Sequence, residues 1–155
     1  MKINLSDYIE DLRANLDAME GVRDVFVFGG KPNDEDLRRV KLQPNSISIL
    51  LTAGGGDLLQ SNDPNAIDSN VVFAAYIIGP TNRQGKDMGY SPKLLDAAQQ
   101  VMGTIKNLKD GSALPHKTQL LPRFLEWGEM TSPIQNSSAH ACWYLVWEQR
   151  VTLNV

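Results

Sequence analysis

The sequence contains few of the side chains with which enzymes perform chemistry. Its 155 residues include one Cys and two His. Cys142 cannot form a disulfide within the chain, and its apolar neighbours in ACWYLVW predict a buried, unreactive thiol. His116 and His140 have no Cys or carboxylate at metal-ligand spacing nearby. We therefore predict no metal site and no cofactor.

A basic excess and a long apolar run are also missing. Acidic residues outnumber basic ones by 18 to 15, which gives a net charge of −3, and Lys and Arg form no cluster. Stable binding to nucleic acid usually requires a basic excess that neutralises phosphates, so nucleic acid is not an expected partner. No segment reaches the roughly 18 apolar residues of a membrane span, and the beginning, MKINLSDYIEDL, does not fit a signal peptide. We predict a cytoplasmic protein without a membrane partner.

The composition is that of one folded domain. Hydrophobic residues make up 42% of the chain and charged residues 21%, as in soluble globular proteins. A chain of 155 residues can bury one contiguous core. We therefore predict a single domain over residues 1–155.

Two segments show the apolar spacing of amphipathic helices. The first has Ser6 as its expected N-cap and Gly21 after its end, and its apolar stripe consists of Leu5, Ile9, Leu12, Leu16 and Met19. The second begins with Ser91 as N-cap and Pro92 at the first helical position, and its stripe consists of Leu94, Ala98, Val101, Ile105 and Leu108. Within it, Gly103 weakens the helix, so we expect close packing against a neighbouring backbone to compensate.

Apolar runs and alternation predict the strands. Residues 71–78 (VVFAAYII) form an uninterrupted apolar run that predicts a strand covered on both faces, and residues 25–28 predict a short one. Residues 46–52 alternate and predict a strand with one wet side. The C-terminal third predicts a hairpin of residues 123–130 and 140–155.

Two long stretches show no strand or helix period. Residues 54–70, which begin with three glycines, and residues 80–90 are expected to be polar loops. Loops of more than about 12 to 15 residues in compact domains are usually functional or disordered. We expect the first of these loops to become ordered on a partner.

Together these elements predict an α+β fold, with a mixed, largely antiparallel sheet of four to five strands and two main helices packed on one face. The last strand would run roughly 40 Å at about 3.3 Å per residue, which exceeds the usual length. Either its end reaches a neighbouring subunit or a bulge at Gln149 interrupts it. Because residues 71–78 and 141–147 are apolar on both sides, we expect another subunit to cover the second face of the sheet.

No motif predicts catalysis. Residues 29–31 (GGK) follow a strand, as a phosphate loop would, but the second upstream Gly and the Ser or Thr after the Lys are absent. Glu126 and Glu129 are an odd number of residues apart in a predicted strand, so they would point to opposite faces. The three Trp residues lack interleaved Lys or Arg, which favours a core or interface role over base stacking. We predict a protein that acts through its surface and is not an enzyme.

The order of the segments resembles the tail terminator (tail completion) family of Mu-like phages. The match covers nearly the whole chain: an N-terminal helix, LRRVKLQPNSISILLT, a later strand, GYSPKLLDAAQQVMGTIKNL and a final strand. The resemblance implies a hexameric ring that caps the head-proximal end of the tail tube, ends tail polymerisation and joins the tail to the neck. It implies the tail tube protein, a neck or head-completion protein and, in a contractile tail, the sheath as partners. It also implies a virion location, with assembly in the host cytoplasm.

The two long polar loops would supply the contacts of such a ring. We expect Asp57, Asp63, Arg83 and Lys86 to lie at or near contacts with the tube or a neighbouring subunit, because polar loops on a sheet scaffold commonly carry recognition. Three alternatives remain open. They are a head-completion or neck connector protein, a small nucleotide-binding hydrolase suggested by residues 29–31 and the acids after them, and an α+β adaptor unrelated to phages.

Overall fold

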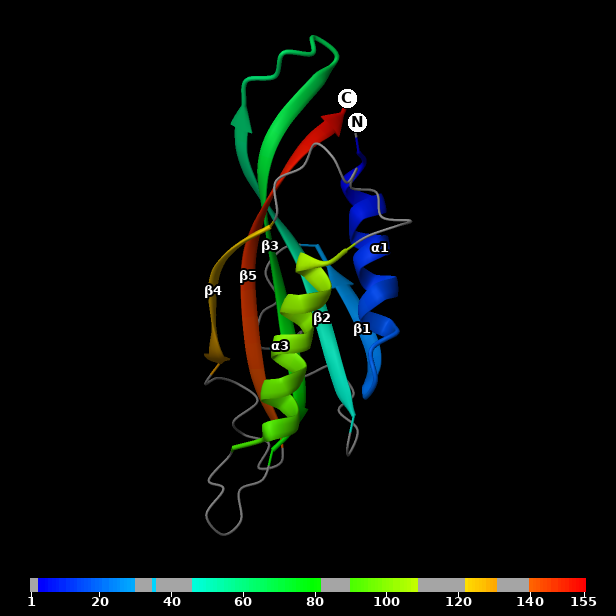
Figure 1. Cartoon of the computed structure of the whole chain (residues 1–155), viewed down its shortest axis with the longest axis vertical. Coiled ribbons are helices and arrows are strands. Elements are labelled where there is room, and N and C mark those ends of the chain that lie inside the picture. The colour runs from blue at the N-terminus through cyan, green and yellow to red at the C-terminus, as the bar shows by residue number, and fades with distance from the viewer. Residues whose placement is uncertain (1–2, 30–34, 36–45, 82–89, 109–121, 131–139) are drawn as a thin grey trace.

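The computed structural model describes residues 3–29, 35, 46–81, 90–108, 122–130 and 140–155, and these form a sheet with two helices on one face (Figure 1). The elements in chain order are α1 (Leu5–Asp17), β1 (Val22–Phe28), β2 (Ile47–Leu59), β3 (Ala66–Pro80), α3 (Pro92–Lys106), β4 (Arg123–Met130) and β5 (His140–Asn154). The predicted α+β class is confirmed.

The five strands form one mixed sheet in the order β1-β2-β3-β5-β4. β1 pairs with β2 in parallel, whereas the three other pairs are antiparallel. Side chains alternate between the two faces of a strand, so odd-numbered residues of β3 and β5 face the helices and even-numbered ones face away. The predicted hairpin of the C-terminal third is present as β4 and β5.

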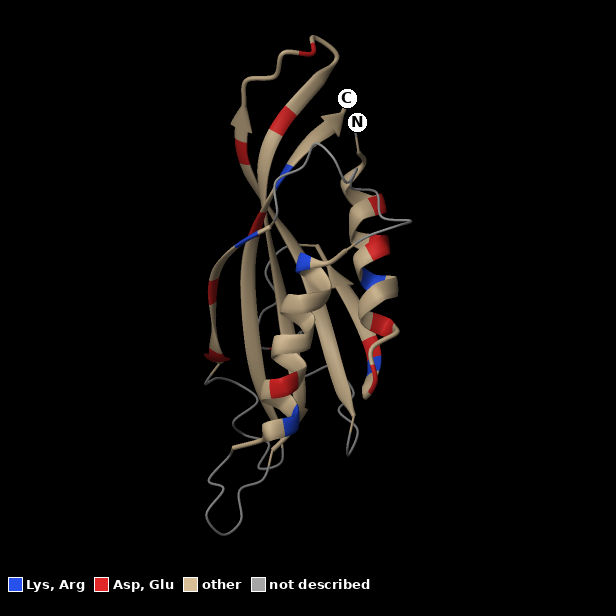
Figure 2. Ribbon diagram, in the orientation of Figure 1, with Lys and Arg blue, Asp and Glu red and all other residues tan. Residues whose placement is uncertain are grey.

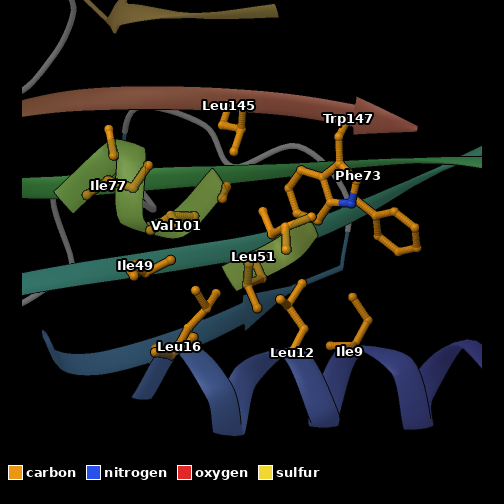
Figure 3. Packing of buried hydrophobic residues seen from close by; sticks show 14 of the residues in the cluster. Ile9, Leu12, Leu16, Ile49, Leu51, Phe73, Ile77, Val101, Leu145 and Trp147 are labelled. Atoms are coloured by element: carbon orange, nitrogen blue, oxygen red, sulfur yellow. The ribbon is translucent and has the colours of Figure 1, made fainter. Parts of the chain in front are cut away.

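The main core lies between the sheet and the two helices (Figure 3). The ring of Phe73 lies 4.8 Å from that of Tyr8 on α1 and 5.5 Å from that of Trp147 on β5. Leu12 and Leu16 of α1 are also fully buried. At about 25 cal/mol per Å² of apolar surface, this layer supplies the main stabilisation of the fold.

The helix boundaries test two N-cap predictions. Ser91 caps α3 as predicted, because its Oγ accepts a hydrogen bond of 3.2 Å from the backbone N–H of Leu94. The prediction for Ser6 was wrong, since α1 begins at Leu5 and Asn4 occupies the N-cap position. The expected close packing at Gly103 is also absent from the part of the chain that the structure describes: a Cβ there would meet none of its heavy atoms outside the helix within 4 Å.

The strand of residues 46–52 has no wet side. Ser48 and Thr52 are buried alongside Leu50, although alternation predicted exposure for the serine. The reason is position: β2 lies inside the sheet between β1 and β3 and carries apolar neighbours on both faces.

β5 is continuous, and its end is paired within the chain. Its register with β3 runs without interruption from the pair Ala66 and Asn154 to the pair Pro80 and His140. Gln149 lies opposite Val71 with no bulge, so the prediction of a bulge there was wrong. The end of β5 pairs with the extended start of β3 within the chain, and its reach to a neighbouring subunit stays a prediction.

Candidate functional site

The first candidate surface is a projecting arm, which we define as residues 54–70, the distal part of the β2 and β3 hairpin (Figure 1). The sequence predicted a loop here, and that prediction was wrong for most of the segment. β2 continues to Leu59 and β3 starts at Ala66, so only residues 60–65 form the turn. β1 ends at Phe28, opposite Thr52, and the arm therefore extends beyond the first strand of the sheet.

The glycines at positions 54–56 explain why β2 continues past residue 53 and why the alternation of residues did not predict this continuation. The register between β2 and β3 shifts between Ala53 and Gly56, which marks a bulge. Gly55 has φ +80°, a conformation that side chains disfavour. A Cβ on Gly56 would lie 1.6 Å from the carbonyl oxygen of Asn70. The glycines let the two backbones approach closely, while the extra residues erase the alternation that would have signalled a strand.

The arm has an apolar side and a polar side. Leu58 lies opposite Ser69 and so shares the helix-facing side with Ile67; their side chains are 72% and 37% exposed. On the other side Asp68 accepts a hydrogen bond of 2.7 Å from Thr152 and forms an ion pair with Arg150 at 3.7 Å. These contacts tie the arm to β5. An ordered element with exposed apolar side chains is typical of a protein contact.

Two of the four predicted contact residues lie on this arm. Asp57 is exposed on β2, and Asp63 is exposed in the turn, where its Oδ1 accepts a hydrogen bond of 2.8 Å from the backbone N–H of Asn65. Figure 2 shows the acidic residues along the arm. Arg83 and Lys86 lie outside the described residues. The arm thus brings Asp57 and Asp63 onto one element that the sequence did not reveal as a hairpin.

The second candidate surface is the sheet face that lies away from the helices. Part of it is already covered in the single chain, because Leu50, Ile78 and Cys142 are fully buried and Tyr76 is nearly so. These residues need no cover from another subunit, whereas cover of the rest of this face by another subunit stays a prediction. Burial raises the pKa of Cys142 to about 12, as expected of an unreactive thiol.

A hollow of about 450 Å³ remains open on this face. Its lining consists of Thr52, Gly54, Val72, Phe73, Ala74, Tyr76, Glu126, Met130, Tyr144 and Val146. Most of these side chains are apolar, and Val72, Ala74 and Val146 are only half-buried. The hollow adjoins the base of the arm at Gly54.

The carboxylate in this hollow is engaged with a phenol and does not form an acid and base pair. Tyr144 donates a hydrogen bond of 2.6 Å to Glu126, and this bond raises the pKa of the Tyr144 phenol. Glu129 lies opposite Trp143, on the other face, as the odd spacing predicted. The two glutamates do not converge on one substrate.

The third candidate surface is the outer edge of β4. In the described part of the chain, β5 is its only strand partner. Trp127 and Leu125 of this strand are 46% and 44% exposed, and the Trp127 ring lies 5.3 Å from that of Trp143. At the opposite edge, the Arg13 side chain of α1 donates a hydrogen bond of 3.1 Å to the carbonyl of Val25 on β1. A helix therefore contacts one edge of the sheet, whereas the other edge has no further strand partner among the described residues.

The described residues contain neither a metal-binding cluster nor a membrane-spanning helix. Within those ranges no three His, Cys, Asp or Glu side chains gather in a way that could hold a metal ion. Neither of the described helices is long and apolar enough to cross a membrane. Gly29 follows β1, while Gly30, Lys31 and His116 lie outside the described residues.

Comparison with known proteins gives a likeness of fold. No protein-family model matches the chain, and no curated protein matches its sequence. Among solved structures, it is similar to a chain in a structure described as the virion of a native gene transfer agent (GTA) particle. The two chains are 15% identical, with a TM-score of 0.52, over 97% of this chain and 95% of the other.

Proposed function

We propose that this chain is a structural subunit of a virion and acts by assembly without catalysing a reaction. The observation that carries the proposal is the likeness of fold over 97% of the chain to a component of a GTA virion particle. Three exposed features of the monomer agree with such a role: the arm, the open hollow and the apolar edge of β4. Monomeric proteins rarely expose several ordered apolar surfaces that have no partner.

Within that role, the finer proposal is a tail terminator. Six copies would form a closed ring by head-to-tail contacts, and one face of the ring would cap the head-proximal end of the tail tube. The other face would meet a neck or head-completion protein, and the ring would be part of the virion after assembly in the host cytoplasm. Asp57, Asp63, Arg83 and Lys86 would lie at or near these contacts. The resemblance in segment order and the projecting arm support this proposal.

Complementation tests the proposal directly. A mutant phage that does not make this chain should produce tails of irregular, excessive length that do not join heads. Wild-type chain supplied in trans should restore normal particles. The variant Asp57→Lys with Asp63→Lys should restore them poorly, because it reverses two charges on the arm. The control Asp17→Lys with Glu20→Lys reverses two exposed charges at the end of α1 and should complement fully.

Electron micrographs of the particles separate the outcomes. Tails of normal length that lack heads would favour a head-completion or connector protein instead of a terminator. Normal particles without this chain would contradict the structural role. The same charge reversal at Arg83 and Lys86 tests the second polar loop, and normal tail length in that variant would count against its proposed contacts.

A further inference from the structure

Among the described residues, two strand edges have no strand partner, and they lie on opposite sides of the same sheet. The first belongs to the arm: β2 continues from Ala53 to Leu59 after β1 has ended opposite Thr52, and β3 is its only described strand partner there. The second is the outer edge of β4, at the other end of the order β1-β2-β3-β5-β4. A free edge presents unpaired backbone N–H and C=O groups, which can bind a further strand.

We propose that the arm edge of one copy pairs with the β4 edge of the next copy, so that the sheet continues from subunit to subunit. The occupant of each edge is a second copy of this chain. Because the two edges are different surfaces, this contact is heterologous and joins subunits head to tail. A contact between two β4 strands would use one edge and leave the arm unpaired.

Strand direction and length agree with this pairing. The antiparallel pairs from β2 through β3 and β5 to β4 make β2 and β4 run in opposite directions. Copies related by rotation about an axis roughly along the strands would therefore place the arm edge and β4 antiparallel. β4 has 8 residues, and the free stretch of β2 from Ala53 to Leu59 is of similar length. Each edge contains a bulge, at Leu125 of β4 and between Ala53 and Gly56 of β2, so the regular stretches for pairing are residues 126–130 and 56–59.

The offset between the two edges sets the tilt that a closed ring requires. The middle of β4 lies at the level of Ala74 on β3, whereas the middle of the arm edge lies at the level of Val71. This difference of three residues amounts to roughly 10 Å along the strands, and the four strands from β2 to β4, with the junction to the next copy, span about 19 Å across them. A ring without an axial step then requires strands tilted by about 28°, which is less than the roughly 35–45° of closed barrels.

The side chains on the two edges also match in polarity. Leu58 on the arm and Trp127 on β4 both lie on the helix-facing side of the sheet, opposite Ser69 and Leu145 respectively. Continuing the sheet brings these exposed apolar groups onto the same face of the junction. Cross-strand apolar pairs stabilise sheets, so the junction would bury surface that the monomer exposes.

This inference rests on the proposed assembly function and specifies the contact between its subunits. The test uses the full chain with Leu58→Cys and Leu125→Cys together, treated with a short bis-maleimide reagent. The double variant should yield a ladder of covalent multimers on a denaturing gel. Each single variant should yield little product beyond monomer. Wild-type chain is the background control, because its one thiol, Cys142, is fully buried.

Two results would overturn the contact. Dimers from Leu125→Cys alone, in the same yield as from the double variant, would indicate β4 pairing with β4. Absence of a ladder would exclude the contact between arm and β4. If native mass spectrometry of the same sample still shows a ring, the assembly function stands and only the contact is wrong, whereas a lone monomer counts against both.

A charge at the edge provides a second test with a matched control. The crosslinking variant already carries Cys at position 58, so Leu58→Lys is made in the wild-type chain. Native mass spectrometry then measures whether the ring forms. Leu58→Lys places a charge on the free edge and should abolish the ring, because edge lysines block strand addition. Ile67→Lys changes the same arm on β3, where Ile67 pairs with Leu153 of β5 and does not belong to the free edge of β2, and should retain the ring. Equal loss in both variants, with unchanged melting temperatures, would contradict edge pairing.

Discussion

The indole Nε1 of Trp147 on β5 donates a hydrogen bond of 3.2 Å to the phenol oxygen of Tyr8 on α1. Both residues are almost fully buried. The bond joins the first helix to the last strand across 139 positions of the chain. It therefore fixes how the helix lies on the sheet from which the arm projects.

Removal of this acceptor gives the first prediction. Tyr8→Phe should lower the free energy of unfolding by about 1–3 kcal/mol, because the buried indole N–H loses its partner. Urea denaturation followed by Trp fluorescence measures this change. Tyr90→Phe removes a hydroxyl from an exposed ring and should have no effect. Equal stability of the Tyr8 variant and wild type would contradict the assigned bond.

Stability should fall at alkaline pH. Burial raises the pKa of Cys142 and of Tyr8 to about 12, from ordinary values of 9.0 and 10.0. Since the unfolded chain releases these protons first, rising pH favours unfolding. These groups should leave the free energy of unfolding unchanged below pH 9 and lower it from about pH 9 to 12. Cys142→Ala should move the onset of the fall toward about pH 10, and an unmoved onset would count against the thiol as its cause.

The glycines of the arm should differ sharply in tolerance. Gly56→Ala should destabilise the protein by about 3 kcal/mol, because the added Cβ collides with the backbone of Asn70. Gly54→Ala is the matched control: its Cβ would lie 3.7 Å from the Val72 carbonyl oxygen, an ordinary contact. That control should change stability by no more than about 0.5 kcal/mol. Amide hydrogen exchange on the arm would locate the effect, and similar values for both variants would refute the close approach.

Gly103→Ala should stabilise the protein. No atom of the described residues outside the helix lies within 4 Å of the added Cβ, and alanine favours a helix over glycine by up to about 1 kcal/mol. Thermal unfolding should show a higher melting temperature. A lower one would mean that the glycine makes a close contact after all.

The helices were largely predictable because their determinants are local. The apolar spacing identified Ile9, Leu12 and Leu16, which are buried in α1, and the Ser91 cap of α3 needs only the next few residues. Tyr8 was not predicted because it lies one position outside the predicted stripe, and its burial depends on contacts with Phe73 of β3 and Trp147 of β5.

The arm and the open edge were not predictable from local patterns. A bulge puts extra residues in one strand, so the alternation of β2 breaks off at the glycines although the pairing continues. Glycines followed by another polar stretch suggest a loop as readily as a bulge. Which edge of the sheet a helix contacts depends on the hydrogen bond from Arg13 of α1 to the carbonyl oxygen of Val25 on β1. The spacing of apolar residues does not predict this contact.

The mass of the intact protein, measured by native mass spectrometry alone and with purified tails, tests the assembly role most directly. The account predicts a closed ring of six copies, formed either spontaneously or on the tail end. A chain that stays monomeric in both samples and does not bind tails would contradict it.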